Sequence, residues 1–100
     1  MTDITVEELK TKMDNKESFF FLDVRETYEH AEYNMNAKNI PLGILPLKLD
    51  ELAEYKDQEI VVHCRSGARS AAAKQLMVKA GFKNVRNLLG GAIARQKMNG

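Results

Sequence analysis

The amino-acid sequence predicts an α/β fold in which helices flank a central, mainly parallel sheet. Predicted strands at residues 19–22, 60–63 and 85–89, of which the first two are short apolar runs, alternate with stretches of helical spacing. No repeat, linker or low-complexity tract interrupts the 100 residues, a length typical of one domain. We therefore expect residues 1–100 to form a single domain, with any ligand bound beyond the carboxyl ends of the strands.

Local signals place the elements of the first half. Thr5 and Glu8 have the spacing of a capping box, which predicts a helix from residue 6 onward. The run at residues 19–22 is apolar throughout, as in a strand that is buried on both faces. Three elements are then expected before the second strand. They are a polar helix at residues 26–33, an extended segment with a turn at residues 40–43, and a short helix at residues 45–53.

The second half begins with the clearest strand, at residues 60–63. His63 at its end is expected to be a satisfied core residue rather than a general base. A helix should follow the next loop and stop at Gly81. Its predicted apolar face consists of Ala72, Ala73, Leu76, Met77 and Ala80. The last elements are a strand at residues 85–89, a turn at Gly90 and Gly91, and a helix at residues 92–98.

The composition indicates an ordinary globular protein, with 44% hydrophobic and 29% charged residues. The mean hydropathy is −0.40, and no apolar run approaches the ~20 residues that a membrane span needs. The N-terminal sequence lacks the basic and apolar regions of a secretory signal. One cysteine excludes an internal disulfide, and with two histidines it does not supply a Cys/His zinc site. We expect a cytoplasmic protein without metal, cofactor or membrane contact.

Charge is distributed unevenly along the chain. Residues 1–59 hold all 14 acids and 7 bases, whereas residues 60–100 hold 8 bases and no acid. If the basic half forms one face, it would place a positive field at the mouth of the site and attract an anionic ligand. The alternative is that acids such as Asp23, Glu26 and Glu29 fold back and cancel this field. Nucleic acid is not an expected partner, because the basic half has a single aromatic residue and so no stacking platform.

The segment at residues 63–70 carries the chemistry that the sequence indicates. A strand delivers Cys64 into a short loop that becomes the N-terminus of a helix. Backbone N–H groups of such a loop and the helix dipole can surround an anion, and Gly67 permits the backbone angles of a tight curl. Arg65 and Arg69 add positive charge and forked donors for an oxyanion. These features favour a thiolate, so Cys64 is predicted to be a nucleophile rather than a small core residue.

Four stretches of the chain follow a recognisable pattern. They are Leu22-Asp23-Val24-Arg25-Glu26, Asn39-Ile40-Pro41-Leu42, the cysteine loop, and Asn84-Val85-Arg86-Asn87-Leu88-Leu89-Gly90-Gly91. In this order, and over essentially the whole length, the chain resembles a single-domain rhodanese, that is, a thiosulfate sulfurtransferase domain. Two places differ from the usual pattern: residues 32–37 form a turn one residue shorter, and Arg95 stands where a tryptophan is common. Neither difference touches the cysteine loop.

The resemblance implies a rhodanese-like fold and a sulfurtransferase that moves sulfane sulfur from thiosulfate or a persulfide donor to a thiophilic acceptor. Cys64 would carry this sulfur as a persulfide. Substrate binding would fall to the residues that follow it: Arg65, Ser66, Gly67, Ala68, Arg69 and Ser70. Asp23 and Arg25 would lie close by and support the loop. The acceptor would be a thiol, cyanide or a protein cysteine.

Two other functions stay open. A cysteine-dependent phosphatase or arsenate reductase has a similar loop, but tyrosine phosphatases typically place five residues between cysteine and arginine. Here four residues separate Cys64 from Arg69, and the shorter loop encloses a space that suits one sulfur atom better than a phosphate. The second alternative is a non-catalytic rhodanese-like binding or regulatory module, although such modules often lack the cysteine that this chain retains.

Overall fold

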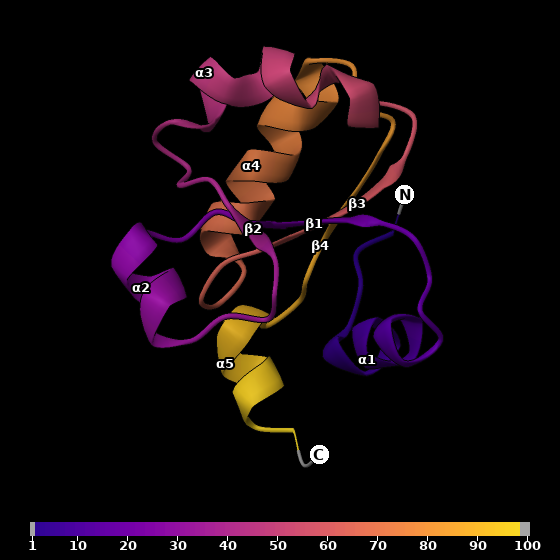
Figure 1. The fold of residues 1–100 in the computed structure, drawn as a ribbon, viewed down its shortest axis with the longest axis vertical. Coiled ribbons are helices and arrows are strands. Elements are labelled where there is room, and N and C mark those ends of the chain that lie inside the picture. Colours follow the sequence, from indigo (N-terminus) through magenta and orange to yellow (C-terminus); the bar gives the residue numbers. More distant parts are fainter. Residues whose placement is uncertain (1, 99–100) are drawn as a thin grey trace.

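The computed structural model describes residues 2–98 and confirms the parallel sheet. Within these residues four strands lie in the order β2-β1-β3-β4, and each pairs with its neighbour in parallel (Figure 1). The strands are β1 (Phe20–Asp23), β2 (Lys38–Asn39), β3 (Glu59–His63) and β4 (Asn84–Asn87). Asp23 stands opposite both Asn39 and His63, so three strands end at the same edge of the sheet.

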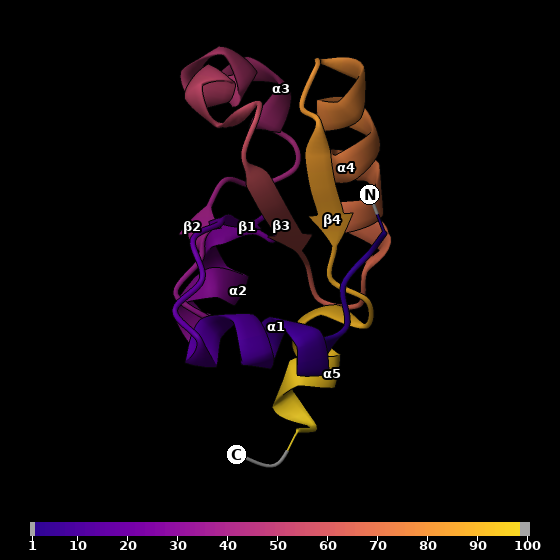
Figure 2. The same ribbon diagram turned by 90° about the vertical axis from the view of Figure 1, so that its right-hand side faces the viewer.

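Helices cover both faces of this sheet. They are α1 (Val6–Asp14), α2 (Thr27–Glu32), α3 (Leu45–Lys48), the 3-10 helix η1 (Leu49–Tyr55), α4 (Ala68–Lys79) and α5 (Gly91–Gln96). Figure 2 shows α4 along β4, and α1 beside α5 at the bottom of the view. Among residues 2–98, no helix is long and apolar enough to cross a membrane.

The alternation of side chains along β3 divides the interior into two cores. Ile60 and Val62 belong to the core that β3 forms with α3, η1 and α4, whereas Val61 belongs to the core closed by α1 and α5. All three side chains are fully buried, which stabilises the fold by roughly 1.5–3 kcal/mol for each. Cys64 lies in the first core, directly after the strand.

Most predicted elements are present with shifted ends. The strand expected at residues 19–22 is β1, which begins one residue later. The extended segment expected at residues 40–43 starts earlier, as β2, and the Ile40 N–H continues its ladder to the Asp23 carbonyl over 2.9 Å. The helix expected at residues 45–53 divides into α3 and η1.

The predicted capping box of α1 is only half formed. Thr5 Oγ1 accepts a hydrogen bond from the Glu8 N–H over 3.1 Å, as expected for an N-cap residue. The Glu8 carboxylate instead accepts from Arg86 Nη2 at 2.6 Å. A tertiary ion pair has therefore replaced the second, local bond of the box.

The buried face of α4 differs from the prediction at one position. Ala72 is exposed, whereas Ala73 and Met77 are buried as expected. Ser70 is also fully buried, although it is polar. The first turn of α4 therefore directs a hydroxyl group toward the sheet and the cysteine loop.

The shortened turn at residues 32–37 is closed by two asparagines. Asn36 has φ +65°, in the left-handed region that asparagine tolerates better than most residues. Its N–H donates to Asn34 Oδ1 over 3.1 Å. The turn directs Met35 into the core closed by α1 and α5.

Candidate active site

Cys64 lies where the central strands end. It follows β3 directly, beside the end of β1 at Asp23. The residue is 1% exposed, and from it the chain curls through Gly67 into α4. The predicted curl is confirmed, because Gly67 has φ +111°, a conformation that only glycine adopts readily. This curl brings the backbone of the loop around the cysteine sulfur.

Hydrogen-bond donors surround the sulfur of Cys64. The Gly67 N–H donates to Sγ over 3.0 Å, and the Ser70 hydroxyl lies 3.3 Å from Sγ. Burial raises the pKa of the Cys64 thiol, but the Ser70 hydroxyl and the N–H groups of Ser70, Gly67 and Ser66 together lower it more. The pKa of Cys64 therefore lies below its ordinary value, and the loop favours a negative charge on this sulfur.

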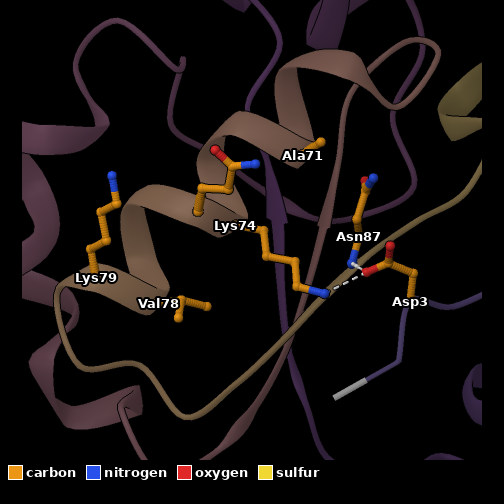
Figure 3. A pocket seen from close by; sticks show the side chains of 7 residues that line it. Asp3, Ala71, Lys74, Val78, Lys79 and Asn87 are labelled. Carbon is orange, nitrogen blue, oxygen red and sulfur yellow. Dashed lines mark hydrogen bonds and ion pairs between the residues drawn. The ribbon is translucent and has the colours of Figure 1, made fainter.

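Asn87 holds the loop from the end of β4. Its Nδ2 donates to the Gly67 carbonyl over 3.2 Å, and its Oδ1 accepts from the Ser70 hydroxyl over 2.5 Å. The Asn87 N–H donates to the Asp3 carboxylate over 3.0 Å, and Lys74 of α4 contacts this carboxylate at 2.7 Å (Figure 3). A chain of polar contacts thus connects the N-terminal segment to the cysteine loop.

Cavity size alone does not locate the site. A cavity with a volume of about 460 Å³ lies along α4, with Lys74 and Val78 on one side and Asp3 and Asn87 on the other (Figure 3). Cys64 is not part of its wall. Cys64 does not line the smaller hollow of about 130 Å³ either, but Arg65, the next residue in sequence, does, and this hollow is therefore the better candidate for the approach of a substrate.

Arg69 is held by a carboxylate of α2. Its Nη1 and Nη2 donate to the two carboxylate oxygens of Glu29 at 2.6 and 2.9 Å. The bond from Arg69 lowers the pKa of Glu29 to about 2. The guanidinium that we predicted to bind substrate is thus engaged in joining α2 to α4. Arg65, in contrast, is exposed at the surface of the loop.

Asp23 and Arg25 form a buried charge cluster next to the loop. Asp23 is fully buried and accepts from Arg25 Nε and Nη2 over 3.0 and 2.8 Å, and His30 Nδ1 lies 2.9 Å from Asp23 Oδ2. Burial raises the pKa of Asp23, but the bonds from Arg25 outweigh it, and the pKa lies below its ordinary value. Arg25 also donates to the Tyr33 carbonyl, which ties the cluster to the end of α2.

His63 lies between this cluster and Cys64. It is fully buried, and its Nε2 lies 3.7 Å from Asp23 Oδ2, beyond hydrogen-bonding distance. Burial lowers the pKa of His63 to about 4, so the ring is neutral at pH 7. The prediction of a core histidine is confirmed. The prediction that its hydrogen bonds are satisfied is wrong, because Nε2 has no partner among residues 2–98.

Comparison with known proteins identifies the family. Residues 5–94 match the model of the rhodanese-like domain. The chain belongs to this family. A sulfurtransferase of Allochromatium vinosum is 33% identical over 95 residues, which cover 94% of this chain and 87% of that protein. The putative sulfur carrier protein YrkF of Bacillus subtilis is 40% identical over 90 residues, which cover 89% of this chain but only 48% of that protein.

A solved structure supports the same assignment. The crystal structure of a rhodanese-like domain protein from Staphylococcus aureus matches with a TM-score of 0.81 and 33% identity, over 95% of this chain and 91% of that one. The resemblance that we drew from four stretches of sequence is therefore confirmed. The fold is the rhodanese-like α/β fold, with the cysteine loop between β3 and α4.

Several residues of this rhodanese-like site have no local sequence signal for their role; they are Glu29, His30, Asn87 and Gly91. Gly91 is the most constrained, with φ +57°. A β-carbon there would lie 2.5 Å from the Cys64 carbonyl oxygen and 2.6 Å from that of Arg65. The next two residues, Ala92 and Ile93, donate their N–H groups to these carbonyls over 2.9 and 3.0 Å. The double glycine indicates a turn in the sequence, but only the fold places this turn against the cysteine loop.

Proposed function

We propose that this chain is a sulfurtransferase in which Cys64 carries sulfane sulfur as a persulfide, taken from thiosulfate or another persulfide donor. The observation that carries the proposal is the pair of donors at Sγ, since the Gly67 N–H and the Ser70 hydroxyl lie within 3.3 Å of it. Such donors favour a nucleophilic thiolate. Membership of the rhodanese-like family, with a relative named sulfurtransferase, supports the same activity.

The reaction has two half-reactions with Cys64 at the centre of both. The thiolate attacks the outer sulfur of thiosulfate, a new S–S bond forms at Sγ, and the S–S bond of thiosulfate breaks with its electron pair leaving on sulfite. An acceptor thiolate then attacks the terminal sulfur of the enzyme persulfide. The Sγ–S bond breaks, the acceptor keeps the sulfur, and the Cys64 thiolate returns. No oxidant or reductant is consumed, and the loop N–H groups from Arg65 to Ser70 surround the transferred sulfur.

Arg65 is the side chain best placed for the sulfonate end of thiosulfate. It is exposed, adjoins Cys64 and lines the smaller hollow, and within residues 2–98 it has no ion-pair partner. Its planar guanidinium can present two donors to an oxyanion. Arg69 can bind substrate only when its hydrogen bonds to Glu29 are broken. We therefore assign the larger share of anion binding to Arg65.

The remaining residues have supporting roles. Asp23 and Arg25 stabilise the edge of the sheet from which the loop starts, through their mutual bonds over 3.0 and 2.8 Å. The acceptor is a thiol or a protein cysteine in the cell, and cyanide serves as the acceptor in an assay. A relative named as a sulfur carrier protein is in keeping with a protein acceptor. Persulfide chemistry needs a reduced cysteine, which a cytoplasmic location would maintain.

Phosphate transfer and non-catalytic binding have weaker support. An arginine that would bind phosphate at the end of the loop is paired with Glu29, and only four residues separate it from Cys64. A binding module would have no use for donors directed at a buried thiol. Turnover of an aryl phosphate, measured beside turnover of thiosulfate, distinguishes a phosphatase from a sulfurtransferase.

Intact-mass spectrometry tests the proposal directly. Incubation with thiosulfate is expected to add the mass of one sulfur atom to the wild type and nothing to Cys64→Ala. Cys64 is the only cysteine, so the site of addition is unambiguous. Cyanide is then expected to remove the added mass and to release thiocyanate. A folded wild-type protein that gains no sulfur from thiosulfate or from a persulfide donor would contradict the proposal.

A further inference from the structure

The Ser70 hydroxyl has three acceptors within reach and one proton to give. Its Oγ lies 2.5 Å from Asn87 Oδ1, 3.2 Å from the Gly67 carbonyl oxygen and 3.3 Å from Cys64 Sγ. A hydroxyl group donates a single hydrogen bond. The three acceptors therefore compete for it, inside a site where Ser70 itself is fully buried.

The Gly67 carbonyl is the weakest competitor. It accepts from the Ala71 N–H over 3.0 Å, as in any helix, and from Asn87 Nδ2 over 3.2 Å. A carbonyl oxygen has two lone pairs, and these two bonds use both. The competition is thus between Asn87 Oδ1 and the sulfur of Cys64.

The same contacts fix the orientation of the Asn87 amide. A reversed amide would place its oxygen against the Gly67 carbonyl oxygen, where two acceptors would repel each other. Asn87 therefore faces Ser70 with an acceptor and Gly67 with a donor. The residue is 7% exposed, and its N–H is held by Asp3, so it has little freedom to turn away.

We propose that Asn87 is a positioning residue of the active site, which competes with the Cys64 sulfur for the proton of the Ser70 hydroxyl. When Cys64 is a thiol, the hydroxyl donates to Asn87, and its oxygen is left to accept from the S–H group. When Cys64 is a thiolate, the hydroxyl turns to the sulfur, because a charged acceptor makes the stronger bond. Asn87 thereby stabilises the thiol, and Ser70 stabilises the thiolate.

The competition has a consequence for sulfur transfer. In a persulfide the negative charge lies on the terminal sulfur, one bond beyond Sγ, so Sγ is a poorer acceptor. The Ser70 hydroxyl then returns to Asn87. The Ser70 hydroxyl therefore donates to the Cys64 sulfur when the cysteine is a free thiolate, and to Asn87 when the cysteine carries the transferred sulfur. This alternation rests on the proposed function, whereas the competition itself is present in the protein before any substrate binds.

A substitution at Asn87 does not itself alter the charged groups around Cys64. At Asn87 these groups are Asp3, which accepts from the Asn87 N–H, and Lys74 of α4, which contacts Asp3. On the side of β1 and α2 they are Asp23, Arg25, Glu29 and His30, and on the side of β3, the loop and α4 they are His63, Arg65 and Arg69. The residues of α5 that contact the loop, Gly91, Ala92 and Ile93, are uncharged. Because Asn87 is uncharged, its replacement by leucine or alanine alters hydrogen bonds and adds no charge to the electrostatic field of these groups.

The pKa of Cys64, followed by the ultraviolet absorbance of its thiolate, tests the proposal. Asn87→Leu retains nearly the shape of asparagine without its hydrogen-bonding groups, and Asn87→Ala removes the side chain. Both are expected to lower the pKa of Cys64 by about 0.5–1, the size that one neutral hydrogen bond corresponds to. Ser70→Ala is expected to raise it. In the Ser70→Ala background Asn87→Leu is expected to have no further effect, because no proton remains to compete for.

Two controls separate this role from packing. Asn84→Ala changes the same residue type at the other end of β4, where the Oδ1 is buried without a partner, and is expected to leave the pKa of Cys64 unchanged. Asn87→Asp keeps an oxygen acceptor against Ser70 and adds a negative charge that disfavours the thiolate, so this variant is expected not to lower the pKa of Cys64. Circular dichroism shows which variants are folded.

The outcomes are distinct. If Asn87 only packed the loop, its loss would loosen the donors around the sulfur, raise the pKa of Cys64, and do so in the Ser70→Ala background as well. A raised or unchanged pKa in the folded Asn87→Leu or Asn87→Ala protein, or a lowered one in Asn87→Asp, would overturn the proposal. A lowered pKa together with failure to take up sulfur would overturn the proposed function instead.

Discussion

The ion pair between Glu29 and Arg69 joins α2 to the first turn of α4, and its removal is expected to weaken the fold. Two parallel bonds, of 2.6 and 2.9 Å, connect the guanidinium to the carboxylate. Glu29→Gln keeps the size of the side chain and removes its charge. The amide can still accept one bond from Arg69, so the change measures the charge-assisted part of the interaction.

The magnitude follows from the pKa of Glu29 and the exposure of its partner. The pKa of Glu29 is lowered from 4.5 to about 2, chiefly by Arg69, and with help from the Glu26 N–H and Arg25; the whole shift corresponds to roughly 3 kcal/mol in favour of the ionised carboxyl for a group shielded from water. The side chain of Arg69 is 36% exposed, and solvent screening reduces the contribution to about 1 kcal/mol. For a domain of this size that loss lowers the Tm by about 4–8 °C.

The stabilisation is expected to depend on pH. The pKa of Glu29 is lower in the folded protein than in the unfolded chain, so the contribution is complete above about pH 4.5. It is lost as the pH falls from 4.5 to about 2. The difference between wild type and Glu29→Gln should therefore be constant near neutrality and shrink in acid.

Urea unfolding of a double-mutant cycle measures this contribution. The cycle consists of the wild type, Glu29→Gln, Arg69→Met and the double variant, and a coupling of about 1 kcal/mol is expected at pH 7. Asp57→Asn is the matched control, because the pair between Asp57 and Lys83 is exposed at both ends and is expected to contribute nothing measurable. A coupling of zero at pH 7, or one that persists in acid, would refute the reasoning.

Three further changes test separate contacts. Gly91→Ala is expected to destabilise the fold by roughly 2–4 kcal/mol in urea unfolding, because its β-carbon would meet two backbone oxygens, whereas Gly43→Ala meets nothing within 4 Å and should be neutral. The wild type should lose stability as the pH falls from 6.5 to about 4, since buried His63 resists protonation, and His63→Leu should remove this part of the pH dependence of the unfolding free energy. Arg65→Ala should lower kcat/KM for thiosulfate more than Arg69→Ala does, with Arg65→Lys restoring only part; equal kinetics in all variants would contradict the assignment of anion binding to Arg65.

The architecture could be predicted because it depends on local patterns. Apolar runs and helical spacing alternate along the chain, and this alternation alone favours a parallel sheet. The ends of elements were less predictable, because tertiary contacts decide them. The Glu8 carboxylate accepts from Arg86 instead of completing the capping box, and the helix that begins at Leu45 changes to the 3-10 helix η1 after Lys48.

The candidate site could be predicted from local pattern only where its residues are consecutive, and the family resemblance added Asp23 and Arg25 beside the loop. Cys64, Gly67 and Ser70 belong to one strand–loop–helix segment, whose geometry follows from the sequence. Glu29 and Asn87 reach the same loop from α2 and β4, and no local pattern shows that they meet it. Glu29 was among the acids that could fold back toward the basic half, but the sequence does not show that its partner is Arg69, in the first turn of α4.

The uneven charge of the two halves of the chain also shows how contacts between remote segments change what the sequence predicts. Four of the 8 bases in residues 60–100 pair with acids of residues 1–59; they are Arg69, Lys74, Lys83 and Arg86. The sheet brings the two halves together, with β1 between β2 and β3, so charges separated in sequence become neighbours in space. Near the cysteine, Glu29 offsets Arg69, so one of the positive charges that we expected to act at the mouth is paired with an acid of the first half. Steering needs uncompensated charge that extends beyond the screening length of about 8–10 Å. The pairing of Arg69 is expected to weaken this steering, so contact with exposed Arg65 and the loop N–H groups would contribute more to holding a thiosulfate ion than attraction from a distance.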